Sequence, residues 1–401
     1  MIAAEKAFNL IMGRPGNWGT EKVPFYETNN RILAEDIYAD RDFPPFNRVS
    51  MDGIGLVFEE INTNRNSFVI AGLQAAGSPQ MELGNPEKCL EVMTGAILPK
   101  NMDTVIPYED ISIKDGIAKI NFFPKIKGQN VHSQANDKKR GDLLIEKGQK
   151  LGPAEIGILA SVGKNRVKIA SLPRVAVLSS GDELLDVDQT PEIHQIRKSN
   201  VWALRTDLLK KGITPKMFHL LDSKENIKTT ISSILKNFDV VMMSGGVSKG
   251  KLDFIPEILD ELDVVKVFHK VKQRPGKPFW FGVYKNKVHF FAFPGNPVST
   301  FSNFHRYFLP WFYKSLKAKS QPLFKLKLTE AFSFKKPLTY FLQVKIVQTK
   351  NGLQAKPMMG KGSGDLANLL ATDGFMVIPQ NVDYCPAGSE FEYIAFRDVG
   401  L

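Results

Sequence analysis

Three polar loops, each directly after an apolar run, carry residue types that bind phosphate groups and divalent cations. They are Ser179-Ser180-Gly181-Asp182-Glu183, Ser244-Gly245-Gly246-Val247-Ser248 and Pro294-Gly295-Asn296-Pro297-Val298-Ser299. Glycine lets the backbone approach a ligand closely, and a helix N-terminus offers free N–H groups to an anion. Two loops lead into predicted helices, and the third carries two carboxylates. The pattern predicts a phosphate-bearing ligand with a divalent cation. The chain has no GxxxxGKS or GxxxxGKT sequence, so this is not a Walker P-loop.

The region that holds these loops alternates between strand-like and helix-like segments. The apolar strand-like runs cover residues 175–178, 217–221, 240–243 and 290–293, and the helical patterns cover residues 199–211, 225–236, 254–262 and 298–316. Such alternation predicts a parallel sheet covered by helices on both faces. Ligands of doubly wound folds bind beyond the carboxyl ends of the strands, so we expect the site there.

Further elements flank this region on both sides. An amphipathic helix is predicted over residues 2–14, and a second helix over residues 31–39. Residues 40–137 are rich in short β-like runs broken by Gly, Pro and Asn, and Asp115-Gly116 is typical of a hairpin turn. The pattern turns to β again near the C-terminus, with strands predicted at residues 324–328, 341–347 and 375–378.

These patterns predict a multidomain α/β plus β protein. The expected parts are an N-terminal or linking domain (1–39 and 138–172), a β-rich insertion domain (40–137), a central doubly wound parallel-sheet domain (173–318) and a C-terminal β domain (319–401). Part of residues 1–20 is expected to pack on the α/β domain. A chain of 401 residues agrees with several domains of roughly 100–200 residues each.

Composition limits the class of protein and its partners. Lys and Arg number 53 against 42 Asp and Glu, so the net charge of +11 favours anionic ligands. Cys89 and Cys385 form no CxxC pair, which argues against a disulfide framework or a cysteine zinc site. No apolar run reaches the ~18 residues of a membrane span, and Glu5 and Lys6 interrupt the apolar N-terminus. We therefore expect a cytoplasmic protein with no membrane or nucleic-acid partner.

Several polar residues also have an ordinary structural interpretation, which local spacing alone leaves open. These alternatives are a capping box of Asp222 and Glu225, an N-cap at Asp253, an N-cap and N1 pair at Asn296-Pro297, a turn at Asp52-Gly53, and solvated charges at Arg274 and Lys277. The joint occurrence of the motifs is what favours a functional site.

Six motifs, in order, resemble those of one known family. They are Ser50-Met51-Asp52-Gly53, Val92-Met93-Thr94-Gly95-Ala96, Ser180-Gly181-Asp182-Glu183-Leu184, Ser244-Gly245-Gly246-Val247-Ser248, Arg274-Pro275-Gly276-Lys277-Pro278 and Pro294-Gly295-Asn296-Pro297-Val298-Ser299. The set resembles the molybdopterin molybdenumtransferases, known as MoeA in bacteria and as the E domain of gephyrin in animals. The resemblance covers almost the whole chain, since residues 363–379 are similar to the family's C-terminal β domain.

The resemblance implies a fold, an assembly and a reaction. The α/β domain would be of the molybdopterin-binding type and the C-terminal domain barrel-like, in an elongated homodimer whose active sites lie between subunits. The implied reaction takes adenylylated molybdopterin and molybdate, inserts the metal at the dithiolene and releases AMP, with Mg²⁺ as cofactor. A molybdopterin adenylyltransferase and molybdoenzymes are the implied protein partners.

The resemblance also assigns roles to individual residues. Glu183 and Asp253 would hold magnesium near the phosphoanhydride, with Asp222 nearby as a third candidate ligand. The other catalytic candidates, which would reach the second subunit's site, are Asp52, Thr94 and Asp137. Substrate-binding candidates are Gly245, Gly246 and Ser248 for the pterin phosphate or nucleotide, Arg274, Lys277 and Ser299 for the oxyanion, and also Ser180, Gly181, Asn200, Ser244, Gly295, Asn296, Pro297 and Ser363.

Five positions depart from the family's pattern. Asp137 lies in Asn136-Asp137-Lys138 instead of the usual Gly-Glu-Asp, and Lys198 stands where an acidic residue is common. Arg274 replaces a lysine, which keeps the charge but changes its geometry. Lys249 stands where an apolar residue is usual, and Gln343 where an arginine often helps to hold the oxyanion.

Two other functions remain open. A nucleotide pyrophosphatase or adenylyltransferase of the competence-damage type would need only the α/β domain and would leave residues 40–137 unexplained. A non-catalytic scaffold, like gephyrin in receptor clustering, could lose its carboxylates, whereas this chain keeps Asp52, Glu183, Asp222 and Asp253. The retained carboxylates favour the enzyme.

Overall fold

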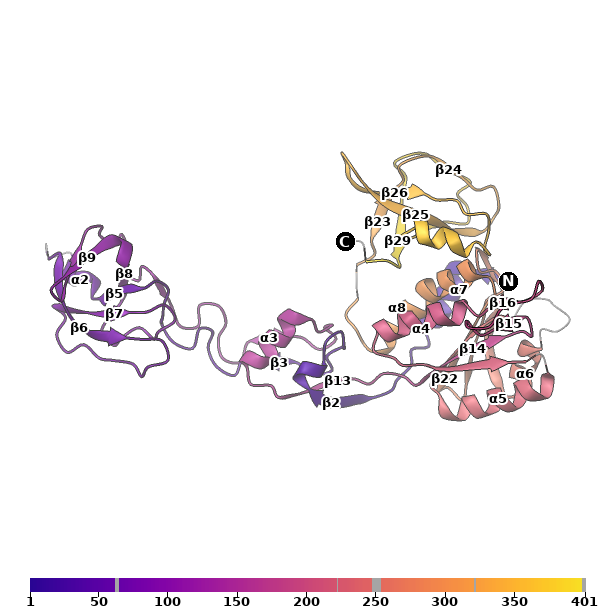
Figure 1. Cartoon of the computed structure of the whole chain (residues 1–401), viewed down its shortest axis with the longest axis horizontal. Coiled ribbons are helices and arrows are strands. Elements are labelled where there is room, and N and C mark those ends of the chain that lie inside the picture. Colours follow the sequence, from indigo (N-terminus) through magenta and orange to yellow (C-terminus); the bar gives the residue numbers. More distant parts are fainter. Residues whose placement is uncertain (62–64, 222, 247–253, 321, 399–401) are drawn as a thin grey trace. The chain divides into compact units, whose positions relative to one another are not determined.

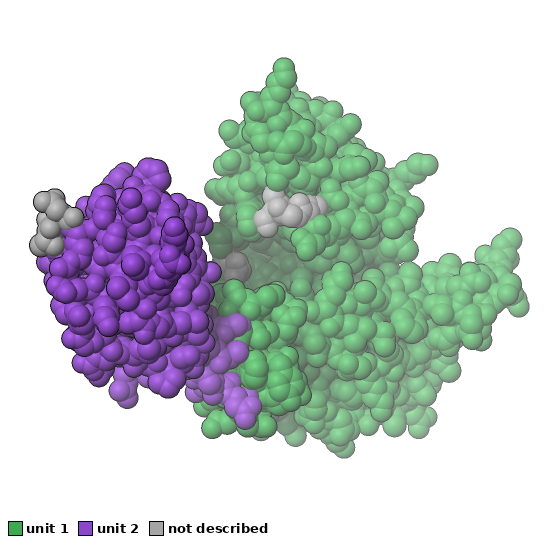
Figure 2. Space-filling model, turned by 60° about the vertical axis from the view of Figure 1, so that its left-hand side comes forward, with its two compact units in different colours: residues 1–35, 147–156, 166–401 green, residues 36–146, 157–165 purple. Residues whose placement is uncertain are grey.

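The chain divides into two compact units, coloured separately in Figure 2. The computed structural model describes residues 1–61, 65–221, 223–246, 254–320 and 322–398. Unit 1 comprises residues 1–35, 147–156 and 166–401, and unit 2 comprises residues 36–146 and 157–165. Each unit has its own sheets and its own buried apolar clusters.

The central sheet of unit 1 has six strands in the order β17-β14-β18-β22-β21-β19. Its parallel strands are β17 (Lys216–Leu220), β14 (Val175–Ser180), β18 (Val240–Ser244) and β22 (Val288–Phe293). The four predicted strands are therefore confirmed. The sheet continues with β21 (Trp280–Tyr284), antiparallel to β22, and β19 (Val264–His269), antiparallel to β21.

Both faces of this sheet are buried under helices. Along β14, Val175 and Val177 belong to one core, and Ala176 and Leu178 belong to another. The first core includes side chains of α1 (Ala4–Met12), α4 (Asn200–Lys210) and α8 (Leu309–Ser315), and the second includes those of α5 (Lys224–Asn237) and α6 (Ile255–Glu261). Figure 1 shows α4 and α8 on the side of the sheet opposite α5 and α6. The predicted doubly wound architecture is confirmed.

The helix predicted over residues 298–316 consists of three segments. It comprises α7 (Pro297–Asn303), a π-helical turn η3 (Phe304–Phe308) and α8 (Leu309–Ser315). Pro310 lies at the start of α8 and has no N–H to donate to the preceding turn. The change of helix type therefore occurs where the regular hydrogen-bond pattern must be interrupted.

The helix predicted over residues 31–39 is wrong. Ile32 and Leu33 form β-bridges to Lys150 and Ile169, and β3 (Ile37–Tyr38) pairs with β12 (Leu143–Ile145). The apolar side chains of this segment are buried through these long-range pairings. Tertiary packing therefore overrides a local spacing that resembles a helix.

A second sheet of unit 1 joins the N-terminus, the α/β region and the C-terminal region. Its order is β1-β20-β25-β27-β29-β23, with β26 paired to β25. The bounds are β1 (Ile2–Ala3), β20 (Val271–Arg274), β25 (Thr339–Thr349), β26 (Gly352–Pro357), β27 (Gly374–Ile378), β29 (Glu390–Ala395) and β23 (Lys325–Lys327). Smaller elements of unit 1 are β2 (Thr20–Pro24) paired with β13 (Arg166–Ala170), β15 (Leu184–Leu185) with β16 (Ile196–Arg197), β24 (Phe332–Ser333) with β28 (Tyr384–Cys385), and the 3-10 turns η1 (Phe25–Glu27) and η4 (Leu366–Ala371).

Unit 2 is built on a six-stranded sheet with the order β8-β5-β7-β6-β10-β9. The bounds are β8 (Thr104–Pro107), β5 (Gly53–Leu56), β7 (Lys88–Val92), β6 (Ser67–Gln74), β10 (Ile117–Ile120) and β9 (Ile111–Lys114). Unit 2 also contains α2 (Phe58–Ile61), the turn η2 (Tyr108–Asp110) and the paired strands β4 (Arg48–Val49) and β11 (Val131–His132). Helix α3 (Pro153–Ser161) begins in residues assigned to unit 1 and ends in residues assigned to unit 2. Asp115 and Gly116 both have positive φ, so the predicted hairpin turn is confirmed.

Candidate functional site

The three polar loops meet at the carboxyl ends of β14, β18 and β22. The strands end at the same level because Ser244 is the register partner of Ser179 on one side and of Phe293 on the other. The backbone N–H of Gly245 donates to the carbonyl of Phe293 at 3.1 Å. A Cβ atom on Gly295 would lie only 3.6 Å from the Cα of Gly245. The expected convergence of the loops is therefore present.

The backbone of the second loop requires glycine. Gly245 and Gly246 have φ values of +102° and +70°, which side chains rarely adopt. A Cβ on Gly246 would lie 2.7 Å from Cγ1 of Ile255 and 2.9 Å from both Cε of Met243 and Oγ of Ser180. Glycine at these two positions therefore lets the backbone pack directly against Ser180, and both residues remain partly exposed.

A hydrogen-bond network connects Asn200 to the loops after β18 and β22. The amide Nδ2 of Asn200 donates to Oγ of Ser244 at 2.8 Å and to the carbonyl of Gly295 at 2.6 Å. The hydroxyls of Ser244 and Thr300 lie 3.1 Å apart, and Thr300 Oγ1 donates to the carbonyl of Pro294 at 2.7 Å. Sequence reasoning missed Thr300, whose only signal is a polar side chain next to a motif.

Asn296 and Pro297 occupy the N-cap and N1 positions of α7, as the structural alternative predicted. The Asn296 side chain, however, makes no capping hydrogen bond. Its Nδ2 instead donates to Oγ of Ser363 at 2.7 Å, and the backbone N–H of Val298 donates to the Ser363 carbonyl at 3.1 Å. Ser363 is thereby brought from the C-terminal region to the loop after β22, and the buried Ser299 follows in the same helix.

A buried polar cluster supports the Arg274–Lys277 segment at the end of β20. Gln273 Nε2 donates to the carbonyl of Gly276 at 3.0 Å and to Oδ1 of Asn303 at 2.6 Å, and the Tyr307 hydroxyl donates to Gln273 Oε1. All three of these supporting side chains are buried, whereas Arg274 and Lys277 are exposed. The two cations are accessible to a ligand, while the buried side chains hold the backbone of their segment in place.

Glu183 is exposed at the end of β14, and its carboxylate folds back over Gly181. A Cβ on Gly181 would lie 2.2 Å from Oε2 of Glu183. No group of three His, Cys, Asp or Glu side chains forms a metal site among the residues that the structure describes. The other two predicted metal ligands, Asp222 and Asp253, lie outside the described residues, as does Ser248.

The capping alternatives for Asp222 and Asp253 likewise lie outside the described residues. Helix α5 begins at Lys224 with Ser223 as its N-cap, and α6 begins at Ile255 with Phe254 as its N-cap.

Unit 2 carries the remaining catalytic candidates. Oδ1 of Asp52 accepts hydrogen bonds from the backbone N–H of Thr94 at 2.6 Å and from its hydroxyl at 2.7 Å. These two bonds lower the pKa of the exposed Asp52 carboxyl. Asp137 does not share this contact; its Oδ1 lies 2.9 Å from Nε2 of His132.

Two of the positions that depart from the family pattern, Lys198 and Gln343, have largely buried side chains. Nζ of Lys198 donates to Oδ1 of Asp186 at 2.9 Å, and only 11% of its side chain is exposed. Burial and the positive charge of Lys198 lower the pKa of His219, which bonds to Ser179 through Nδ1. Gln343 is buried on β25, and its Oε1 has no hydrogen-bond partner in the described part of the chain.

Comparisons with family models cover most of the chain. Residues 2–163 match the MoeA N-terminal region (domain I and II), residues 176–314 a probable molybdopterin binding domain, and residues 325–396 the MoeA C-terminal region (domain IV). Within the described ranges, none of the helices combines the length and the apolar character that crossing a membrane requires.

Individual relatives align over nearly the full length. A protein from Synechocystis sp. named molybdopterin molybdenumtransferase is 40% identical over 400 residues, which covers 99% of this chain and 100% of the relative. One of the same name from Staphylococcus epidermidis is 28% identical and covers 98% of this chain and 95% of its own length. A crystal structure of a molybdopterin biosynthesis MoeA protein from Pyrococcus horikoshii has a TM-score of 0.82 and 31% identity, covering 99% of this chain and 100% of that one.

Proposed function

The chain belongs to the molybdopterin molybdenumtransferase family, and we propose that it inserts molybdate into adenylylated molybdopterin with release of AMP. The observation that carries this proposal is the meeting of three loops at the carboxyl ends of β14, β18 and β22, where the partly exposed Gly245 and Gly246 lie beside Ser180. The pterin phosphate or the nucleotide would lie against these two glycines. Asn200 and Ser244 would hold the loops after β18 and β22 together through the hydrogen bonds described above.

We assign the oxyanion to the exposed cations at the end of β20. Arg274 and Lys277 supply positive charge, and Ser299 supplies a hydroxyl donor, which together match a tetrahedral dianion. The buried cluster beneath them fixes the backbone of this segment, so little ordering of the loop is needed when molybdate binds. Gln343 adds no charge, and this leaves Arg274 and Lys277 as the cations assigned to the anion.

Magnesium fits the one proposed ligand that the structure describes. The Glu183 carboxylate lies over the end of β14 with its oxygens accessible, and Mg²⁺ prefers such hard oxygen donors together with phosphate oxygens. Asp222 and Asp253 are proposed to complete the set. When bound, the ion would neutralise charge on the phosphoanhydride as the bond to AMP breaks.

The oligomeric state and the cellular location are also proposals. We assign a homodimer in the cytoplasm, in which Asp52, Thr94 and Asp137 act at the site of the second subunit. The substrate is adenylylated, so an adenylyltransferase must precede this enzyme, and molybdoenzymes must receive the product. The hydrogen bonds that keep Asp52 ionised support its use in hydrolysis or orientation.

The test incubates purified protein with adenylylated molybdopterin, Mg²⁺ and molybdate, and measures AMP and active cofactor together. Asp52→Asn and Asp253→Asn should abolish molybdate-dependent AMP release. Asp115→Asn is the matched control, because it removes an exposed carboxylate from a turn position that Asn also tolerates. AMP release that ignores molybdate would indicate a nucleotide hydrolase, and tight binding without turnover would indicate a scaffold.

A further inference from the structure

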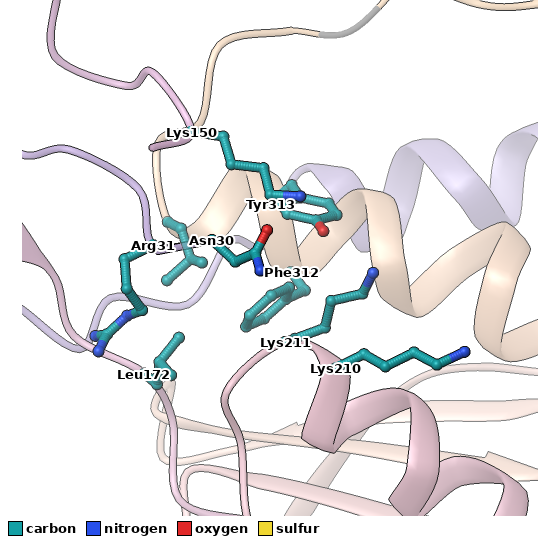
Figure 3. Close-up of a pocket in the computed structure, with 9 residues that line it drawn as sticks. Asn30, Arg31, Lys150, Leu172, Lys210, Lys211, Phe312 and Tyr313 are labelled. Atoms are coloured by element: carbon teal, nitrogen blue, oxygen red, sulfur yellow. The ribbon is translucent and has the colours of Figure 1, made fainter. Parts of the chain in front are cut away.

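The pocket drawn in Figure 3 has too little space for a ligand. It lies in unit 1 and is lined by Asn30, Lys150 and Tyr313 among other residues, with room for about one water molecule. Lys210 also lines it, but its side chain points away in Figure 3. The basic residues around this pocket therefore do not define a binding site.

A chain of hydrogen bonds in unit 2 ends at Asp137. Arg48 and His132 are register partners of the paired strands β4 and β11, so their side chains lie on the same face. Nη2 of Arg48 lies 3.1 Å from Nδ1 of His132, and Nε2 of His132 lies 2.9 Å from Oδ1 of Asp137. Both ring nitrogens of His132 are thus bonded, one to a cation and the other to a candidate catalytic carboxylate.

The two partners determine which nitrogen of His132 carries the proton. A guanidinium has only donors, so Nδ1 of His132 must accept the hydrogen bond from Arg48. An ionised carboxylate has only acceptors, so Nε2 must carry the proton that bonds to Asp137. The amide nitrogen of Asn136 lies 3.3 Å from Nε2, but it is itself a donor and cannot accept this proton. The geometry therefore fits one form of His132, the neutral ring protonated at Nε2.

Strand β4 also leads directly to Asp52. Val49 of this strand makes two backbone hydrogen bonds of 2.9 Å with residues 95–96, directly after Thr94. On the opposite side, Val49 is the register partner of Val131 in β11. Strand β4 therefore lies between the segments that carry the other two catalytic motifs, so the hydrogen-bonded chain and the Asp52–Thr94 pair belong to one local structure.

The second oxygen of Asp137 remains available to a ligand. In the described part of the chain, Oδ2 of Asp137 has no hydrogen-bond partner, and the side chain is 54% exposed. A neutral N–H orients the carboxylate without cancelling its charge, whereas a lysine or an arginine in that place would form an ion pair. We propose that His132, held by Arg48, is a positioning residue that fixes Asp137 with Oδ2 presented to the substrate. This inference rests on the proposed function, in which Asp137 acts at the active site of the second subunit.

The first experiment determines the tautomer of His132 by nitrogen-15 NMR of the full chain labelled at histidine, above the pH at which imidazole titrates. His132 should show an unprotonated Nδ1 and a protonated Nε2, and Arg48→Leu should shift both signals toward the average of two tautomers. His194 is the matched control, because it is exposed and its Nδ1 lies 3.6 Å from a carboxylate oxygen of Glu192 instead of a guanidinium. It should give averaged signals that Arg48→Leu does not change. A protonated Nδ1 in His132, or signals like those of His194, would overturn the proposal.

The second experiment measures molybdate-dependent AMP release. His132→Ala should lower kcat about tenfold, because one charge-assisted hydrogen bond to Asp137 is lost. His132→Gln should restore most of the rate, since its amide oxygen can accept from Arg48 and its amide N–H can donate to Asp137. His194→Ala is the control and should leave the rate unchanged.

A double variant tests whether His132 acts through Asp137. His132→Ala combined with Asp137→Ala should be no slower than Asp137→Ala alone. Additive losses, or an unchanged rate in His132→Ala, would overturn the positioning role. If the unmodified protein releases no AMP, the proposed function fails, while the tautomer of His132 still decides whether Arg48 and His132 hold Asp137.

Discussion

Asp52 and Thr94 are joined through a single carboxylate oxygen, which accepts both the backbone N–H and the hydroxyl of Thr94. The two residues flank paired strands of unit 2, since Gly53 of β5 is the register partner of Val92 of β7. Two motifs that lie 42 residues apart in the sequence thus form one local structure. An exposed aspartate is held in one orientation and in its ionised form.

Thr94→Val should raise the pKa of the Asp52 carboxyl toward its ordinary value. The larger cause of the lowered pKa is the backbone hydrogen bond, which remains, so the change is partial. A carboxyl whose folded-state pKa is lowered stabilises the fold above its ordinary pKa, and this contribution disappears as the pH falls through the lowered value. In the variant this contribution is smaller and its loss is complete at a higher pH, whereas the onset of the loss, set by the ordinary pKa of the unfolded chain, is unchanged. Carbon-13 NMR titration of Asp52 measures the shift.

Thr94→Ser is the control for this experiment, because it keeps a hydroxyl in place. Its Asp52 carboxyl should titrate as in the unmodified protein. If Thr94→Val also left the titration unchanged, the side-chain hydrogen bond would not contribute in solution.

Gly246→Ala should destabilise unit 1 and weaken nucleotide binding. A side chain at this position has both an unfavourable φ of +70° and contacts under 3.0 Å with Ile255, Met243 and Ser180. Gly352→Ala separates the two effects, since Gly352 has φ of +90° and open space around it. The backbone term costs roughly 1–2 kcal/mol, and crowding adds about 1–3 kcal/mol at Gly246 alone. Urea unfolding and calorimetric titration with AMP measure both variants; equal losses would contradict the crowding.

The parts of the fold that the sequence predicted are those with strong local patterns. Strands β14, β18 and β22 are buried on both faces, so they are continuous apolar runs whose ends mark the site loops. The segment 31–39 misled because its buried Ile and Leu residues are paired with β partners more than a hundred residues away. The local spacing of apolar residues does not indicate such long-range pairings.

The supporting residues of the site were not predictable for a related reason. Gln273, Asn303 and Tyr307 are separated by 30 and 34 positions along the chain, and each alone is an ordinary polar residue. Their role depends on the packing of β20 against α7 and η3. The same applies to Asn296, whose position as an N-cap was predicted, while its bond to Ser363 depends on the C-terminal region.

Tyr307→Phe should lower the free energy of unfolding by about 1–3 kcal/mol, because it leaves the buried Oε1 of Gln273 without a donor. Tyr384→Phe is the control, since Tyr384 is 61% exposed and water replaces its lost contacts. Urea unfolding gives both values. The affinity of Tyr307→Phe for molybdate should also fall, because the Arg274–Lys277 backbone loses support. Equal stability of the two variants would mean that water satisfies Gln273 in the unmodified protein.

The bond between Asn296 and Ser363 should couple two parts of the candidate site. Asn296→Ala and Ser363→Ala each remove the same 2.7 Å hydrogen bond, so the double variant should lose less nucleotide affinity than the sum of the single variants. A neutral hydrogen bond of this kind predicts a coupling energy of about 0.5–1.5 kcal/mol. Calorimetric titration of the four proteins with AMP closes the cycle. Additive losses would show that the two side chains contact the ligand independently, and unchanged affinity in all variants would remove both from the substrate-binding set.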